Sequence, residues 1–265
     1  MGTDLRSDPR PAPPISAHAP AYGPLSTLYY DAATPRAAEP EVAWYRARLP
    51  RDAGALLEAM AGSGRLLLPL TEEGFRVHGV DVSEPMLASC ATRLGAAGRD
   101  TQLFRQDIAA LNLPFRYGAA FVAAGSFQLL TGRAAARDAL ARLRAHLIEP
   151  ALLLLDLFVP DAALHPPGAP VVEVSSVALS DGSQIVHRSE TTTDPERRRI
   201  RTESRYERRL AGRIVAREDE LLTLTWHTEQ EMVAMLRGEG YRDIRIEPPA
   251  WPREQGRYYA VTARA

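Results

Sequence analysis

A glycine-containing turn between two short apolar runs carries the residues of this sequence best suited to bind a ligand. Residues 56–65 read L-L-E-A-M-A-G-S-G-R, and a second apolar run, residues 77–80, is followed by Asp81. A strand, a glycine turn and a helix in this order form the first unit of a nucleotide-type cofactor site. An acid at the end of the second strand usually accepts hydrogen bonds from ribose hydroxyls. The pattern therefore predicts an adenosine-type cofactor beside Glu58 and Asp81.

The residues around this turn exclude the two common phosphate-binding loops. The dinucleotide fingerprint needs a third glycine for close helix packing, and this chain has Leu67 at that position. A phosphate loop of the G-x-x-x-x-G-K-S/T type needs a lysine, and the chain contains none. Glu58, just before the turn, would repel a phosphate but attract an ammonium or sulfonium group. The sequence therefore predicts a cationic adenosine ligand.

Three segments resemble motifs of the class I S-adenosylmethionine (SAM) dependent methyltransferases. They read E-A-M-A-G-S-G-R, G-V-D-V-S-E-P-M-L and R-Q-D-I, and Met60 replaces the first of the three glycines usual in the first motif. The resemblance covers about residues 45–160 and 225–265. It implies SAM as cofactor and S-adenosylhomocysteine as product. The cofactor-binding residues implied in this way are Tyr30, Glu58, Ala61, Gly62, Gly64, Asp81, Val82, Met86, Asp107, Ile108 and Gly125.

Composition bounds the class of protein. A chain of 265 residues, 45% apolar and 25% charged, suits one large α/β domain or one domain with a subdomain. Its net charge of −1 gives no field that would steer it to nucleic acid or to anionic membrane. The single cysteine, Cys90, cannot form an internal disulfide, and the histidines lack metal-ligand spacing. We expect a soluble cytoplasmic protein with a small-molecule substrate, no metal, and no nucleic-acid or membrane partner, and homodimerisation stays open.

The apolar periodicity predicts an α/β fold, a doubly wound Rossmann-like sheet with an antiparallel β lid inserted before the last helix. The expected core strands are 55–60, 76–80, 101–105, 119–124 and 151–158, and the expected helices between them lie near 64–71, 84–94 and 134–147. Period-two segments predict a four-stranded meander over residues 171–226, with turns at Asp181-Gly182, Asp194-Pro195 and Ala211-Gly212. A capping box, T-E-Q-E, then starts the last helix, and two strands close the chain, 243–246 and 258–262.

These elements predict four parts of the chain. They are a flexible N-terminal arm (1–20), a helical cap over the cofactor site (21–50), a SAM-binding core (51–160 and 227–265) and a lid that forms the substrate subdomain (161–226).

This layout resembles the small-molecule N-methyltransferases that act on nucleotide-linked aminosugars, and more loosely the glycine N-methyltransferases. Tyr22 precedes the Tyr30-Asp31 pair by the spacing of a substrate tyrosine in the aminosugar enzymes, and His227 precedes the capping box as in that group. Gln128 stands where those enzymes have a histidine, and a glutamine can orient an acceptor but cannot take its proton. The resemblance implies Tyr22 and His227 as catalytic residues. The implied substrate-binding residues are Tyr22, Phe127, Gln128, Glu203, Arg205, Trp226 and His227.

The chemistry of methyl transfer limits the catalytic groups that are needed. Displacement at a sulfonium removes charge, so alignment in a dry site supplies most of the acceleration. A neutral amine needs little more, whereas a hydroxyl or carbon acceptor needs a base, such as His227, Glu203 or a tyrosinate. We predict a SAM-dependent methyltransferase of a small-molecule, secondary-metabolite acceptor, with nitrogen favoured over oxygen. The alternatives are a C-methyltransferase and a protein of this fold without methyl transfer, which would be a cyclase, an isomerase or a ligand-binding protein.

Overall fold

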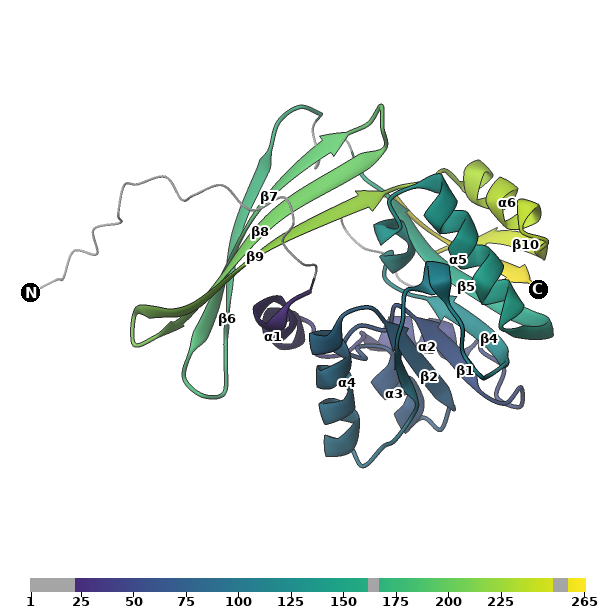
Figure 1. Cartoon of the computed structure of the whole chain (residues 1–265), viewed down its shortest axis with the longest axis horizontal. Coiled ribbons are helices and arrows are strands. Elements are labelled where there is room, and N and C mark those ends of the chain that lie inside the picture. Colours follow the sequence, from purple (N-terminus) through teal and green to yellow (C-terminus); the bar gives the residue numbers. More distant parts are fainter. Residues whose placement is uncertain (1–21, 162–166, 250–256) are drawn as a thin grey trace, which may run out of the picture.

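Two β-sheets organise the chain in the computed structural model, which describes residues 22–161, 167–249 and 257–265 (Figure 1). Within these residues, a seven-stranded sheet has the order β10-β11-β5-β4-β1-β2-β3 and a four-stranded sheet has the order β6-β7-β8-β9. The predicted flexible arm, residues 1–20, lies outside the described residues.

The seven-stranded sheet contains the predicted parallel core and the closing hairpin. The strands are β1 (Leu56–Ala59), β2 (Val77–Asp81), β3 (Leu103–Arg105), β4 (Tyr117–Val122), β5 (Leu147–Val159), β10 (Arg242–Glu247) and β11 (Arg257–Arg264). Strands β1 to β5 pair in parallel, whereas β11 is antiparallel to both β5 and β10. The chain runs from β1 outward to β3 and then returns to place β4 on the other side of β1. This reversal of strand order creates a crevice at the carboxyl ends of β1 and β4, where ligands bind in such sheets.

Helices cover both faces of this sheet. The helices that do so are α2 (Glu39–Arg46), α3 (Leu67–Glu72), α4 (Glu84–Ala96), α5 (Arg133–Ala145) and α6 (Glu229–Gly238). The described residues also contain α1 (Pro24–Ala33) and the 3-10 turns η1 (Ile108–Ala110) and η2 (Ser126–Leu129). Side chains of a strand alternate between faces. Leu57 and Leu153 pack with α5 and α6, whereas Leu56 and Leu154 pack with α2, α3 and α4. The continuous apolar runs read from the sequence therefore correspond to strands buried on both faces.

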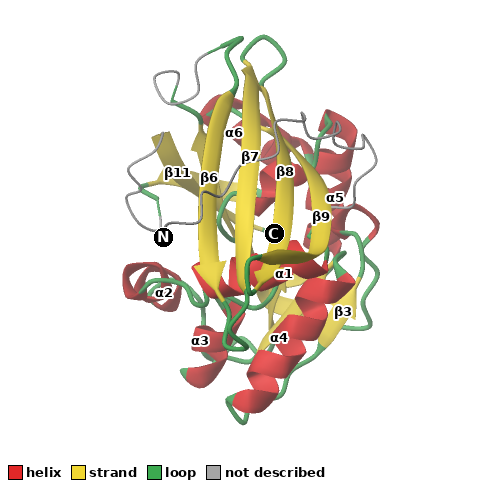
Figure 2. Cartoon of the chain, turned by 90° about the vertical axis from the view of Figure 1, so that its left-hand side faces the viewer, coloured by secondary structure: helices red, strands yellow, loops and turns green. Residues whose placement is uncertain are grey.

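The four-stranded sheet is the predicted antiparallel lid, and we call it the lid sheet. Its strands are β6 (Val171–Ala178), β7 (Gln184–Asp194), β8 (Arg199–Leu210) and β9 (Arg213–Thr225), which lie side by side (Figure 2). All three predicted turns connect consecutive strands of this meander. The capping box at Thr228 and Glu231 also forms as predicted and starts α6.

Helix α1 packs against the lid sheet as well as against α4. Leu25 of α1 forms a small buried cluster with Ile185 of β7 and Tyr206 of β8. The Tyr29 ring lies beside the stacked rings of Tyr206 and His187. The N-terminal helix is thus one contact between the lid sheet and the core, and β9 also contacts η2.

The largest differences from the predicted element boundaries are at α3 and β5. Helix α3 begins at Leu67 and not near Gly64, because Gly62 and Gly64 have left-handed backbones (φ 55° and 78°) and form a turn. Strand β5 extends to residues 147–159 because its pairing with β11 continues to Val159. None of the helices in the described segments is long and apolar enough to cross a bilayer.

The central position of β1 generates a stability prediction. Leu57 is fully buried in the core, so Leu57→Ala should lower the free energy of unfolding by about 2–5 kcal/mol through lost burial and a residual cavity. Denaturant unfolding measures the change. Leu210→Ala is the control, because Leu210 is 47% exposed at the end of β8 and should lose far less. Equal losses in the two variants would contradict this account of the core.

Candidate functional site

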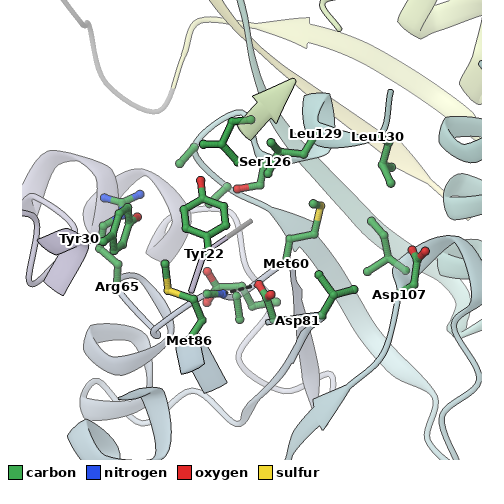
Figure 3. Close-up of a pocket in the computed structure, with 18 of the residues that line it drawn as sticks. Tyr22, Tyr30, Met60, Arg65, Asp81, Met86, Asp107, Ser126, Leu129 and Leu130 are labelled. Carbon is green, nitrogen blue, oxygen red and sulfur yellow. Dashed lines mark hydrogen bonds between the residues drawn. The ribbon is translucent and has the colours of Figure 1, made fainter. Parts of the chain in front are cut away.

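A cavity of about 450 Å³ lies at the carboxyl ends of β1, β2 and β4 and is bordered by α1 and β9 (Figure 3). Its wall brings together most of the residues that the sequence assigns to the cofactor. These are Tyr30, Glu58, Ala61, Gly62, Asp81, Val82, Met86, Asp107 and Ile108, and Tyr22, which the sequence assigns to catalysis and the substrate, lies in the same wall. The crevice created by the reversal of strand order therefore contains a cavity that most of the predicted cofactor residues line.

Asp81 is held in place by the turns that follow β1 and β2. Its Oδ2 accepts a hydrogen bond from the Gly62 amide (2.8 Å), and its Oδ1 accepts one from the Ser83 amide (2.9 Å). Burial raises the pKa of Asp81, while these two backbone amides act in the opposite direction. The carboxylate is thus oriented before any ligand binds and retains lone pairs for further donors.

The turn between β1 and α3 depends on its left-handed residues. A Cβ on Gly64 would lie 2.6 Å from Sγ of Cys90 in α4, so Gly64 permits close packing of the turn on that helix. Gly64 is not part of the cavity wall. Met60 has a left-handed backbone (φ 58°) although it is not a glycine, which costs about 1 kcal/mol. Its side chain lines the cavity, and Figure 3 shows it between Tyr22 and Asp107.

Arg65 is a cavity residue that the sequence reasoning missed. Its guanidinium forms two hydrogen bonds with the Glu41 carboxylate of α2 (2.5 and 2.7 Å), and both side chains are buried. It lines the cavity near Tyr30. The sequence signal was its place directly after G-S-G. That signal had little weight because arginine replaces lysine throughout this chain.

The far side of the cavity also contains residues that the sequence reasoning missed. They come from the end of β4, from η2 and the residues after it, and from β9. Those with the largest side chains are Ser126, Leu129, Leu130, Thr131, Leu221, Leu222 and Thr223.

Three residues of the G-S-F-Q segment lie behind the cavity wall. The Gln128 side chain accepts from the Phe158 amide (2.8 Å) and donates to the Phe158 carbonyl (2.9 Å), so both ends of its amide are occupied. Phe127 is fully buried in the core. Gly125 has a left-handed backbone (φ 73°), and a Cβ there would meet the Phe158 ring at 2.9 Å. These residues shape the η2 turn that presents Ser126.

The four remaining residues predicted to bind the substrate also lie outside this wall. Arg205 makes two hydrogen bonds to Asp219 (2.7 and 3.0 Å), and Glu203 pairs with Arg201. Both alternate along β8 with Tyr206, which faces α1, so they lie on the opposite face of the lid sheet. Trp226 and His227 are buried between β9 and α6. Burial lowers the pKa of His227, and its Nε2 has no hydrogen-bond partner among the described residues.

Comparison with known proteins identifies the segment that builds most of this site. Residues 56–149 match the methyltransferase domain family. This segment is a methyltransferase domain. It contains β1 to β4, the glycine turn and Asp81, so the family that the three motifs resemble is confirmed over the core of the chain.

A sequence relative and two solved structures extend the comparison. A Geobacillus sp. (strain WCH70) protein, provisionally named a methyltransferase, is 30% identical over 107 residues, or 40% of this chain. The match spans 43% of that relative's length. The sugar N-methyltransferase KedS8 from Streptoalloteichus sp. has a TM-score of 0.73 and 20% identity over 96% of this chain and 98% of its own. CalS10, an amino pentose methyltransferase from Micromonospora echinaspora, has a TM-score of 0.60 and 23% identity over 84% and 87%. The predicted fold class is confirmed.

Glu58 places a buried carboxyl in the wall of the cavity. Its side chain is buried, and Oε2 has no hydrogen-bond partner among the described residues. Burial raises the pKa of Glu58 well above its ordinary value, and the neighbouring acids Glu41 and Asp81 add to this effect, while Arg65 opposes it. The site therefore favours a cation that would stabilise the ionised carboxylate.

The raised pKa of Glu58 predicts that a proton is released when a cationic ligand binds. A carboxyl with a raised pKa is favourable when protonated, and ionising it costs stability as the pH rises through that pKa. A bound cation offsets this cost, so SAM binding below the raised pKa of Glu58 should release a proton, and affinity should increase with pH. Calorimetry in two buffers of different ionisation enthalpy measures the release.

The variant Glu58→Gln should abolish this release. Glu84→Gln is the control, because the Glu84 side chain is 72% exposed at the start of α4. A release that persists in Glu58→Gln would assign the proton to another group.

Proposed function

We propose that this protein transfers a methyl group from SAM to the nitrogen of a small-molecule amine, a secondary metabolite. The observation that carries this proposal is the division of charge in the cavity wall. The charged side chains of the wall are Glu58, Arg65, Asp81 and Asp107, which follow or end the first strands of the sheet. The opposite side, formed by η2, the residues after it and β9, is lined by apolar and hydroxyl side chains within the described residues.

The charged side suits the functional groups of SAM. Glu58 faces the cationic methionine half of SAM, and the Arg65 guanidinium pairs with the carboxylate of that methionine half. Asp81 accepts from the ribose hydroxyls, and Asp107 accepts from the adenine amino group. Val82 and Met86 flank the adenine ring. The cavity volume falls within the usual range for small-ligand sites, roughly 300–1,000 Å³.

The uncharged side suits an acceptor that needs no base. The lone pair of a neutral amine forms the new N–C bond as the S–C bond of SAM breaks, and the sulfonium becomes the neutral thioether of S-adenosylhomocysteine. The positive charge passes to the methylated amine, which loses its proton to water. The wall on this side has no ionisable group among the described residues, so alignment and exclusion of water supply the acceleration. Two structural neighbours, a sugar N-methyltransferase and a SAM-bound amino pentose methyltransferase, support this proposal.

The proposal is tested with methyl-labelled SAM and pairs of acceptors that differ only in an amine or a hydroxyl. We expect the label to appear in the amine with an equal amount of S-adenosylhomocysteine. A labelled alcohol would replace the proposal with O-methylation. A product isomeric with its substrate, formed without S-adenosylhomocysteine, would identify a protein of this fold that transfers no methyl group.

The role of Tyr22 is tested separately. Burial and the nearby Glu220 raise the pKa of Tyr22, so its hydroxyl remains protonated at neutral pH. Tyr22→Phe should therefore lower kcat/KM by about tenfold or less, the value of one neutral hydrogen bond, without changing the pH profile. Kinetics from about pH 6 to 9 measure both effects. Loss of one limb of the profile in the variant would instead assign acid–base catalysis to Tyr22.

A further inference from the structure

We propose that Glu220 of β9 is a positioning residue that couples the lid sheet to the cofactor half of the cavity. This inference rests on the proposed function for its meaning in catalysis, but the contacts that carry it are independent of the ligand. They run from β9 through the residues before α1 to the turn that holds Asp81.

The Glu220 carboxylate is buried at the junction of the lid sheet and α1. It is fully inaccessible, and one of its oxygens accepts a hydrogen bond from the backbone amide of Tyr22. The other oxygen accepts from the Tyr206 hydroxyl of β8 (3.1 Å). A buried carboxylate is costly unless its oxygens find such donors, so this contact fixes the position of Tyr22 closely.

Glu218 supports the same junction from the same face of β9. Its two oxygens accept from the backbone amides of Leu25 (2.8 Å) and Ser26 (3.0 Å). Helix α1 has no side-chain cap of its own, so a strand of the lid sheet caps it. The approach is close, because a Cβ on Gly23 would lie 2.7 Å from the Glu218 carboxylate. Glycine before the helix thus permits the lid sheet to hold α1 by its first turn.

The contacts continue from Tyr22 into the cofactor half of the cavity. The Tyr22 carbonyl accepts from the Ser83 hydroxyl (2.7 Å), and the Ser83 amide donates to Asp81 (2.9 Å). The second oxygen of Asp81 accepts from the Gly62 amide. A continuous series of hydrogen bonds therefore joins Glu220 of the lid sheet to the acid placed at the ribose.

The same strand also forms part of the acceptor side. Residues 221–223, directly after Glu220, line the cavity opposite the charged residues. An acceptor that packs against these residues orders the strand that holds Tyr22, and a cofactor that packs under Tyr22 orders the same contact from the other side. Glu220 therefore links the two halves of one site, and coupling of this kind is reciprocal.

The test compares three variants for S-adenosylhomocysteine affinity, melting temperature and backbone hydrogen exchange. Glu220→Leu removes both hydrogen bonds, whereas Glu220→Gln retains an acceptor oxygen. Glu207→Leu is the matched control, because Glu207 is a carboxylate of the lid sheet paired with Arg209 and Arg217 on the opposite face. Calorimetry gives the dissociation constant, and exchange is followed at the amides of residues 22–26.

We expect Glu220→Leu to weaken S-adenosylhomocysteine about tenfold to hundredfold, the usual loss for hydrogen bonds to a charged group, with faster exchange at residues 22–26. Glu220→Gln should show a smaller change of the same kind. Glu207→Leu should match the unaltered protein in S-adenosylhomocysteine affinity and in exchange at residues 22–26. A lower melting temperature with unchanged affinity would overturn the proposal, because Glu220 would then only stabilise the fold.

The result also separates this inference from the proposed function. If the unaltered protein does not bind S-adenosylhomocysteine, the proposed function fails, while exchange at residues 22–26 still tests the contact between β9 and α1. If Glu220→Leu does not fold, the affinity and exchange of Glu220→Gln decide the inference. Unchanged values for that variant would then overturn it.

Discussion

Two backbone amides share the carboxylate of Asp81, and the charged side of the cavity depends on this arrangement. One amide belongs to Gly62, which follows β1, and the other belongs to Ser83, which follows β2. The ends of two neighbouring parallel strands are thereby fixed relative to each other. The Ser83 hydroxyl also donates to the Tyr22 carbonyl, so Ser83 determines where the residues before α1 meet the core. A half-buried acid that accepts from two backbone amides is thus the point at which β1, β2 and the residues before α1 are joined.

The parts predicted well from sequence are those that local patterns determine. Each of these patterns depends on a few neighbouring residues. The structure contains the predicted strands, the capping box at Thr228 and the three turns of the lid sheet. The glycine turn and Asp81 are equally local, and most of the residues predicted to bind the cofactor line the cavity. Arg65 was not predicted because the position of its side chain depends on Glu41, a partner 24 residues earlier in α2. Neither composition nor spacing indicates such a pair.

The residues predicted to bind the substrate lie outside the cavity wall, except for Tyr22, because the uncharged side of the wall depends on contacts between distant segments. Gln128 looked like a substrate ligand, but β5 extends far enough for the Phe158 backbone to occupy both ends of its amide. Arg205 and Glu203 looked functional because they are charged. Strand alternation places them on the opposite face from Tyr206, and only the packing of α1 shows which face meets the core. The uncharged residues 221–223 carry no signal of their own and enter the wall through the position of β9.

Met60 combines a strained backbone with a side chain in the cavity wall. Elsewhere in a protein, enlarging a buried space lowers stability, because packing is lost and nothing is gained in return. At Met60 the loss of packing is opposed by relief of backbone strain, since a glycine would relax the backbone while it opens the wall. The volume of the cavity and the stability of the fold can therefore increase together here. Met60 is thus a natural starting point for enlarging the cavity without the loss of stability that usually accompanies such a change.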